Sequence, residues 1–172
     1  MKSKDKLEVE LRARVDESIL QKISVPLESQ SDEYDSYFRY DPDTNKDWVV
    51  RIRRRQERFF LTFKSNKKFG EGAWSEINLE IDKETSKKFR DFFISNGFIL
   101  DVEIVKNRKT FYHEDLEINI DDIKGLGMFI EAEIMTNDIE MGKEKIKKFF
   151  QSLGISDDQI INKGYVALIK EL

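Results

Sequence analysis

The chain has 172 residues, of which 37% are charged and 39% hydrophobic, and its formal net charge is −4 at pH 7. This length predicts a single domain, residues 1–172, with a substantial core. The absence of cysteine excludes disulfides and thiolate metal sites, and the acidic balance argues against a dedicated nucleic-acid binder, because phosphate backbones attract basic surfaces.

The first predicted strand, residues 8–15, reads "EVELRARV" and alternates charged with apolar residues. Successive side chains of a strand point to opposite sides, so its two acids and two bases share one face. For a single strand, the simplest interpretation is that this face meets water.

Further elements follow along the whole chain. Extended patterns occupy residues 35–41 (with a turn at Pro42), 47–64 (two strands around a turn at 56–58), 74–82, 98–112 (broken near its start), 116–121 and 128–135. A polar loop is expected at 65–72. Helical patterns occupy residues 16–23, capped by Asp16, 82–97, capped by Asp82 and ended by Gly97, 137–154, and a short segment begun by Ser156. These elements predict an α+β protein built on an antiparallel, eight-stranded, barrel-like sheet.

Charge recurs at period two on nearly every strand, for example in "VRIRR", "SEINLE" and "FIEAE". The charged faces could coat the outside of a barrel or line its interior. The two Phe-rich helices favour a charged interior, because their apolar stripes need apolar sheet surface to cover. Since buried charges are costly unless they satisfy one another or a ligand, a barrel lined in this way predicts a binding site.

The charged residues of the predicted interior define the ligand. Hard oxygen ligands suited to Mg²⁺ or Mn²⁺ are offered by Glu8, Glu10, Asp121, Glu131 and Glu133. Phosphoryl oxygens could be held by Arg12, Arg14, Arg51, Arg53, Lys64, Lys106 and Arg108. Metal on one wall and bases around the rest suit a polyanion such as a triphosphate, without a P-loop motif.

These residues resemble the signature of the CYTH superfamily, the triphosphate tunnel enzymes. Glu8-Val9-Glu10-Leu11-Arg12 resembles the family's ExExK strand, with Arg in place of Lys. The segments "DSYF", "VVRIRR", "LTFK", "VKNR" and "IDDIKGLGMFIEAE" resemble later family motifs in order, and "NKGYVALI" is a weaker match to the last. The resemblance implies a closed barrel with a charged interior and helices packed outside.

The resemblance also implies roles for individual residues. The five acids above would face the metal, the bases would hold the triphosphate with Lys163 as a further contributor, and Arg12, Glu10 and Glu131 would be catalytic. Glu76 and Glu80 would be wall partners that orient the bases. Arg12 is the main departure, because a guanidinium differs from an ammonium in reach and geometry.

The implied reaction is metal-dependent displacement at phosphorus, and the cyclase-like "DSYF" favours a class IV adenylyl cyclase acting on ATP. A thiamine triphosphatase or tripolyphosphatase and a non-catalytic nucleotide or polyphosphate binder stay open. We expect Glu131→Gln and Arg53→Ala each to abolish turnover and leave the fold intact. We also expect a cytoplasmic protein without nucleic-acid or membrane partners. No apolar run is long enough to span a bilayer, and "MKSKDK" lacks the apolar core of a signal peptide. The oligomeric state stays open, and a homodimer is one possibility.

Overall fold

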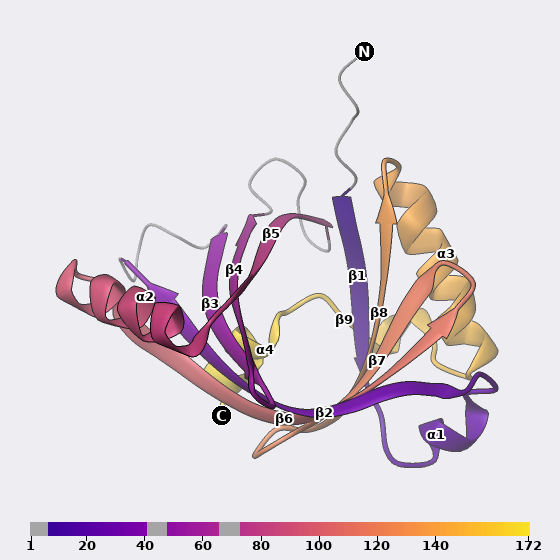
Figure 1. The fold of residues 1–172 in the computed structure, drawn as a ribbon. Coiled ribbons are helices and arrows are strands. Elements are labelled where there is room, and N and C mark those ends of the chain that lie inside the picture. The colour runs from indigo at the N-terminus through magenta and orange to yellow at the C-terminus, as the bar shows by residue number, and fades with distance from the viewer. Residues whose placement is uncertain (1–6, 41–47, 66–72) are drawn as a thin grey trace.

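The computed structural model describes residues 7–40, 48–65 and 73–172. The turn expected at Pro42 and the loop expected up to residue 72 lie outside these residues, apart from Ser65. Within them, eight antiparallel strands close into a barrel, with one extra strand and four helices around it (Figure 1). The predicted α+β barrel is confirmed.

The elements, in chain order, are β1 (Leu7–Arg14), α1 (Ile19–Lys22), β2 (Leu27–Arg39), β3 (Trp48–Arg55), β4 (Arg58–Ser65), β5 (Ala73–Ile81), α2 (Lys83–Ser95), β6 (Ile99–His113), β7 (Leu116–Ile123), β8 (Gly127–Thr136), α3 (Ile139–Ser152), the 3-10 helix η1 (Asp157–Gln159), β9 (Ile160–Ile161) and α4 (Tyr165–Lys170). The strand order is β5-β4-β3-β2-β6-β7-β8-β1-β9. Among the described residues, no helix combines the length and the apolar character that a bilayer span requires.

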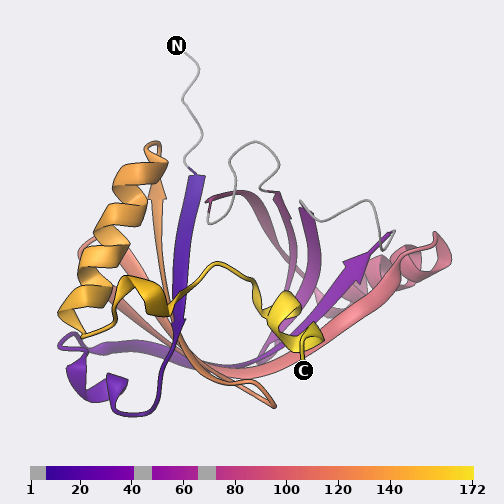
Figure 2. The same ribbon diagram turned by 180° about the vertical axis from the view of Figure 1, so that it is seen from behind.

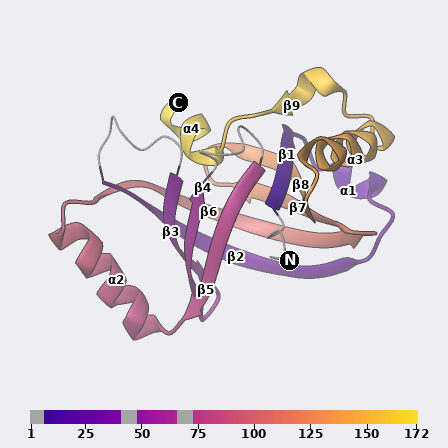
Figure 3. The ribbon, with the colours of Figure 1, turned by 90° about the horizontal axis from the view of Figure 1, so that it is seen from above.

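The barrel closes where β1 meets β5, and the two strands lie side by side in Figure 3. Within the described residues, two residue pairs join them, Glu8 with Trp74 and Val9 with Ala73. Farther along the same edge of β1, the short strand β9 pairs through Ile160 and Ile161. The chain then runs from β9 across the molecule to α4 (Figure 2), which contacts β6.

Local sequence signals explain most element boundaries. The β3–β4 turn contains Gln56 at φ 53°, and the Asp82 carboxylate accepts a hydrogen bond from the Thr85 amide at 2.8 Å to cap α2. Gly97, at φ +87°, ends that helix because a left-handed residue there favours glycine. These predictions are confirmed.

Two predictions about strands were wrong. Strand β2 begins at Leu27 rather than near residue 35, because it pairs with β6 along most of its length. Strand β6 is one strand of 15 residues rather than a broken one. The irregularity lies at Asp101, which has no partner between the pairs Tyr37–Val102 and Phe38–Leu100, so a bulge absorbs it and the ladder continues.

The apolar core lies between the outside of the barrel and the helices. On one side, Ile146 and Phe150 of α3 pack on residues such as Val9 and Ala132, all fully buried. On the other side, α2 covers the outer face of β3 and β4, with Phe93 in the same cluster as Val50 and Leu61. The alternate residues of these strands therefore point inward, and the prediction of a charged interior is confirmed.

Candidate functional site

A cavity of about 350 Å³ lies inside the barrel. Its cationic lining comes from β1, β3, β4 and β6 and consists of Arg12, Arg51, Arg53, Arg55, Lys64, Lys106 and Arg108. Its acidic lining consists of Glu8, Glu10, Glu76, Glu117, Glu131 and Glu133. The inner faces of separate strands thus bring together most of both charge sets that the sequence predicts, without Asp121 and Arg14.

Three carboxylates form a cluster at one part of this cavity. Glu8, Glu10 and Glu133 each offer an oxygen within 4.8 Å of the others, and the described residues contain no other such acidic group. The strand register explains the grouping, because Glu10 of β1 lies directly opposite Glu133 of β8. Hard oxygen donors of this kind suit Mg²⁺ or Mn²⁺.

The cluster carries more negative charge than its surroundings balance. Burial, with repulsion from Glu10 and Glu76, raises the pKa of Glu8 to about 7 although Lys64 opposes the shift. Burial and the nearby Glu8 and Glu117 raise the pKa of Glu133 well above its usual range. A divalent cation would relieve this repulsion, so the residues fit a metal ion.

Glu10 and Lys64 link the carboxylate cluster to the bases. Although burial opposes ionisation, Lys64 and Arg12 hold the pKa of Glu10 at about 2. The Lys64 ammonium lies 2.5 Å from Glu8 Oε1, 2.9 Å from Glu76 Oε2 and 3.5 Å from Glu10 Oε2. Lys64 is therefore shared among three acids, and Glu76 acts as the expected wall partner.

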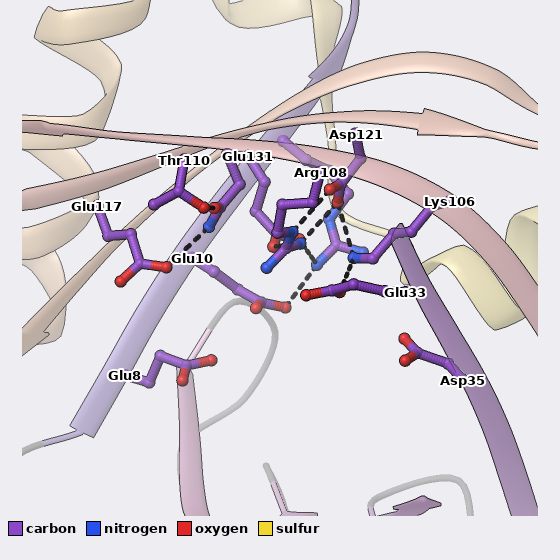
Figure 4. A network of polar contacts seen from close by, with 12 residues as sticks. Glu8, Glu10, Glu33, Asp35, Lys106, Arg108, Thr110, Glu117, Asp121 and Glu131 are labelled. Atoms are coloured by element: carbon purple, nitrogen blue, oxygen red, sulfur yellow. Dashed lines mark hydrogen bonds and ion pairs between the residues drawn. The ribbon is translucent and has the colours of Figure 1, made fainter. Parts of the chain in front are cut away.

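Asp121 belongs to a second network, shown in Figure 4. Its carboxylate accepts hydrogen bonds from Arg108 Nε at 2.7 Å, Arg108 Nη2 at 2.6 Å and Lys106 Nζ at 3.0 Å. Despite burial, Arg108 and Lys106 hold the pKa of Asp121 well below its usual range. Asp121 therefore lies outside the carboxylate cluster and holds two bases in place, and its role as a metal-facing acid stays a prediction.

Glu33 and Asp35 of β2 are site residues that the sequence analysis missed. Asp35 accepts two hydrogen bonds from Arg53, at 2.6 and 2.7 Å, and Glu33 lies 3.1 Å from Arg53 and 3.5 Å from Lys106. Both acids are almost completely buried. The period-two alternation in "EYDSY" carried this signal, but the predicted strand began only at Asp35.

Arg12 lies between two of the acids expected to accompany it. Its Nη2 atom is 2.6 Å from Glu10 and 2.9 Å from Glu131. Burial opposes the charged form, but these two carboxylates raise the pKa of Arg12 above its usual range. Arg12 is therefore a permanent cation and a positioned charge rather than a proton acceptor.

Besides Asp121, three predicted contributors do not line the cavity. Arg14 is exposed, donates to the Leu126 carbonyl at 2.6 Å and stacks on Phe129, which fills the barrel interior beyond Glu131. The Lys163 ammonium pairs with Glu171 at 2.6 Å. Glu80 is exposed and pairs with Arg58. Arg14 and Glu80 lie on the predicted faces of β1 and β5, but at positions beyond the cavity where the side chains meet solvent, whereas Lys163 lies between β9 and α4.

A family model described as the CYTH domain matches residues 6–165. The chain belongs to the CYTH family. A Methanocaldococcus jannaschii relative named "Putative adenylate cyclase MJ0240" is 33% identical, with 94% of this chain and 98% of that protein covered.

Solved structures share the CYTH fold. The PH1819 protein from Pyrococcus horikoshii superposes with a TM-score of 0.85 at 28% identity, covering 95% of this chain and 98% of that one. A Hippeastrum protein, described as a "putative adenylyl cyclase" with a dominant triphosphatase activity, superposes with a TM-score of 0.68 at 18% identity, covering 96% and 95%. At 18% identity, the similarity to the Hippeastrum protein shows a shared fold and nothing more.

The raised pKa of Glu8 predicts an unusual pH dependence of stability for this CYTH protein. The unfolded chain releases this proton near pH 4.5 and the folded chain near 7, so metal-free protein should lose stability as pH rises through this window. The opposite shift of Glu10, to about 2, adds stability that is lost as pH falls below 4.5.

We therefore expect the Tm in a chelator to fall by roughly 5 °C between pH 5 and 7.5. Mg²⁺ or Mn²⁺ should remove most of this fall, because a bound cation favours the ionised cluster. Thermal unfolding followed by circular dichroism at both pH values checks this prediction. A Tm that climbs steadily to pH 7.5 without metal would contradict it.

Proposed function

We propose that this CYTH protein is a divalent-metal-dependent adenylyl cyclase of the class IV type, which converts ATP to cyclic AMP and pyrophosphate. The observation that carries the proposal is one cavity with a cluster of three carboxylates beside a set of guanidinium and ammonium groups. Such a cavity is complementary to a metal-bound triphosphate. The cyclase name of the 33% identical relative supports this choice of reaction.

The bases would bind the phosphates and stabilise the charge that develops on the leaving group. Arg51 is the least engaged of them: its Nη1 is 3.9 Å from Asp35 and its Nη2 donates to Thr62 at 3.1 Å. Arg53 and Arg108 are held by short ion pairs to buried acids, which fixes their orientation before substrate arrives. The substrate would therefore meet donors that are already in place.

In the proposed reaction, the ribose 3′-oxygen forms a bond to the α-phosphorus while the bond from that phosphorus to the bridging oxygen breaks. The electron pair leaves with pyrophosphate and the hydroxyl proton is released. A divalent ion held by Glu8, Glu10 and Glu133 would neutralise phosphate charge and polarise the phosphoryl oxygens. Arg12, as a permanent cation between Glu10 and Glu131, would stabilise negative charge at the transferred phosphoryl group.

A second reaction, hydrolysis of the triphosphate by water, is supported by the dominant triphosphatase activity ascribed to the Hippeastrum protein. The two reactions differ in whether the cavity also holds an organic group. Trp74 lines the cavity, and Lys64 Nζ lies 5.9 Å from the centre of its indole ring. An aromatic ring next to the phosphate-binding bases favours a nucleoside over an inorganic triphosphate.

This interpretation predicts a substrate-selective effect of Trp74→Leu. We expect about a tenfold higher KM for ATP, because a stacked base loses roughly 1–3 kcal/mol, and a change of less than about twofold in the Kd for tripolyphosphate. Steady-state kinetics and calorimetry provide the two values. Equal losses for both ligands would mean that Trp74 supports the cavity wall and does not recognise a base.

The deciding experiment separates products after incubation with Mg²⁺ or Mn²⁺ and ATP, thiamine triphosphate or tripolyphosphate. Cyclic AMP with pyrophosphate is expected. Orthophosphate would replace the cyclase proposal with a triphosphatase, and tight binding without turnover would leave a nucleotide or polyphosphate binder. A Glu133→Gln preparation, purified identically, controls for contaminating phosphatases.

A further inference from the structure

The Arg12 guanidinium is held by more than its two carboxylates. Both Glu10 and Glu131 contact the same nitrogen, Nη2. Two ion pairs to one atom fix where that atom lies, but they leave the plane of the guanidinium free to turn about it. Another contact must therefore set the plane.

Tyr165 provides this contact. The Arg12 Cζ atom lies 4.6 Å from the centre of the Tyr165 ring, and Arg12 Nη1 lies 3.5 Å from the Lys163 carbonyl oxygen. The ring is itself buried, packs edge-on against Phe129 with centroids 5.4 Å apart, and has Lys106 Nζ 5.4 Å from its centre. A ring confined in this way can hold a flat cation in one orientation.

The chain path explains why Tyr165 reaches Arg12. Strand β9 pairs with β1 through the backbone of Arg12 and Ile161, which anchors the C-terminal segment at the residue that it covers. Farther on, Lys170 of α4 forms an ion pair with Asp101 of β6 at 2.5 Å. Both ends of the segment are therefore attached to the barrel.

We propose that Tyr165 is a positioning residue that fixes the guanidinium plane of Arg12 toward the phosphates, so that the C-terminal segment completes the site. This proposal rests on the proposed function insofar as the cavity binds a triphosphate. It predicts a dependence on residue type. A guanidinium has a plane that the ring orients, whereas a lysine ammonium has none. In the Arg12→Lys protein, loss of the Tyr165 ring should therefore leave the affinity for the phosphates nearly unchanged.

A double-mutant cycle tests the proposal. Tripolyphosphate affinity is measured by calorimetry in a chelator, where no metal-dependent turnover occurs, for Arg12→Lys, Tyr165→Leu and the double variant. We expect Tyr165→Leu to weaken binding about tenfold in the Arg12 protein and less than about twofold in the Arg12→Lys background. Tyr165→Phe, which keeps the ring, should stay within about threefold of the unmodified protein in affinity.

Phe150→Leu is the matched control, because Phe150 is a fully buried ring of the separate core cluster beneath α3, whereas Tyr165 belongs to the cluster around Phe129. It should lower the Tm without any dependence on the residue at position 12. Equal losses for Tyr165→Leu in both backgrounds would overturn the proposal and reduce Tyr165 to a packing residue.

A measurement on the unmodified protein covers the case in which Tyr165→Leu fails to fold. If the ring covers Arg12, the NMR signals of the Arg12 δ protons should be shifted upfield by its ring current, and unshifted signals would overturn the proposal. Failure of the proposed function looks different. In that case ATP would give no cyclic AMP, while the coupling in tripolyphosphate binding would persist.

Discussion

Glu133→Gln is expected to abolish metal-dependent turnover, with a loss of more than roughly 100-fold, and at the same time to leave the metal-free protein as stable as before or more stable. The variant removes one of the three oxygen donors that would hold the cation. It also removes a half-buried carboxyl that Glu8 and Glu117 repel and whose pKa lies well above its usual range. Activity and metal-free stability should therefore move independently or in opposite directions.

Glu76→Gln is the matched comparison. Glu76 also lines the cavity, but Lys64 is 2.9 Å away and lowers its pKa in spite of burial, so this acid stabilises the fold in its charged form. We expect Glu76→Gln to lower the Tm at pH 7.5, where Glu133→Gln does not. Metal affinity by calorimetry and Tm in a chelator measure the two effects. A strongly destabilised Glu133→Gln protein that still bound Mg²⁺ with unchanged affinity would contradict the assignment of the cluster.

Arg53→Ala is expected to cost about 3–5 kcal/mol in the free energy of unfolding, which corresponds to roughly 6–20 °C in Tm for a chain of this length. Without the guanidinium, Asp35 keeps only Arg51 at 3.9 Å among its ion pairs within the described residues. Glu33 keeps Arg55 and Lys106, but it stays fully buried. The sequence-based expectation of an intact fold is thus revised, because the acids that Arg53 neutralises were not recognised.

Arg58→Ala is the control for this prediction. Arg58 and Glu80 form an ion pair as short as that of Arg53 with Asp35, at 2.5 Å against 2.6 Å, but both partners are exposed. Water and salt screen such a pair, so its loss should lower the Tm by no more than a few degrees. Urea unfolding of the two variants provides the comparison. Similar small losses in both would mean that the interior network does not depend on Arg53.

Much of the fold was readable from the sequence because its signals are local. The alternation in "EVELRARV" identifies a strand with one charged face, and the Asp82 cap with Gly97 delimits α2. The Phe-rich stripes of two helices indicated which face of the sheet is covered. Local patterns could not give the start of β2, since Leu27–Glu33 is extended through its pairing with β6.

The sequence by itself determined the composition of the site, namely carboxylates and bases on the inner faces of a barrel without cysteine ligands. Only the tertiary structure decided which of these charges meet. Arg12 and Arg14 share a face, yet Arg12 lies in the cavity and Arg14 lies beyond the Phe129 ring in solvent. Likewise, Glu133 joins Glu8 and Glu10, whereas Asp121 is enclosed by Arg108 and Lys106. The physical reason is that period-two alternation fixes only whether a side chain points into or out of the barrel. Its position along the barrel axis and its neighbours depend on strand register and on the C-terminal segment that returns to β1.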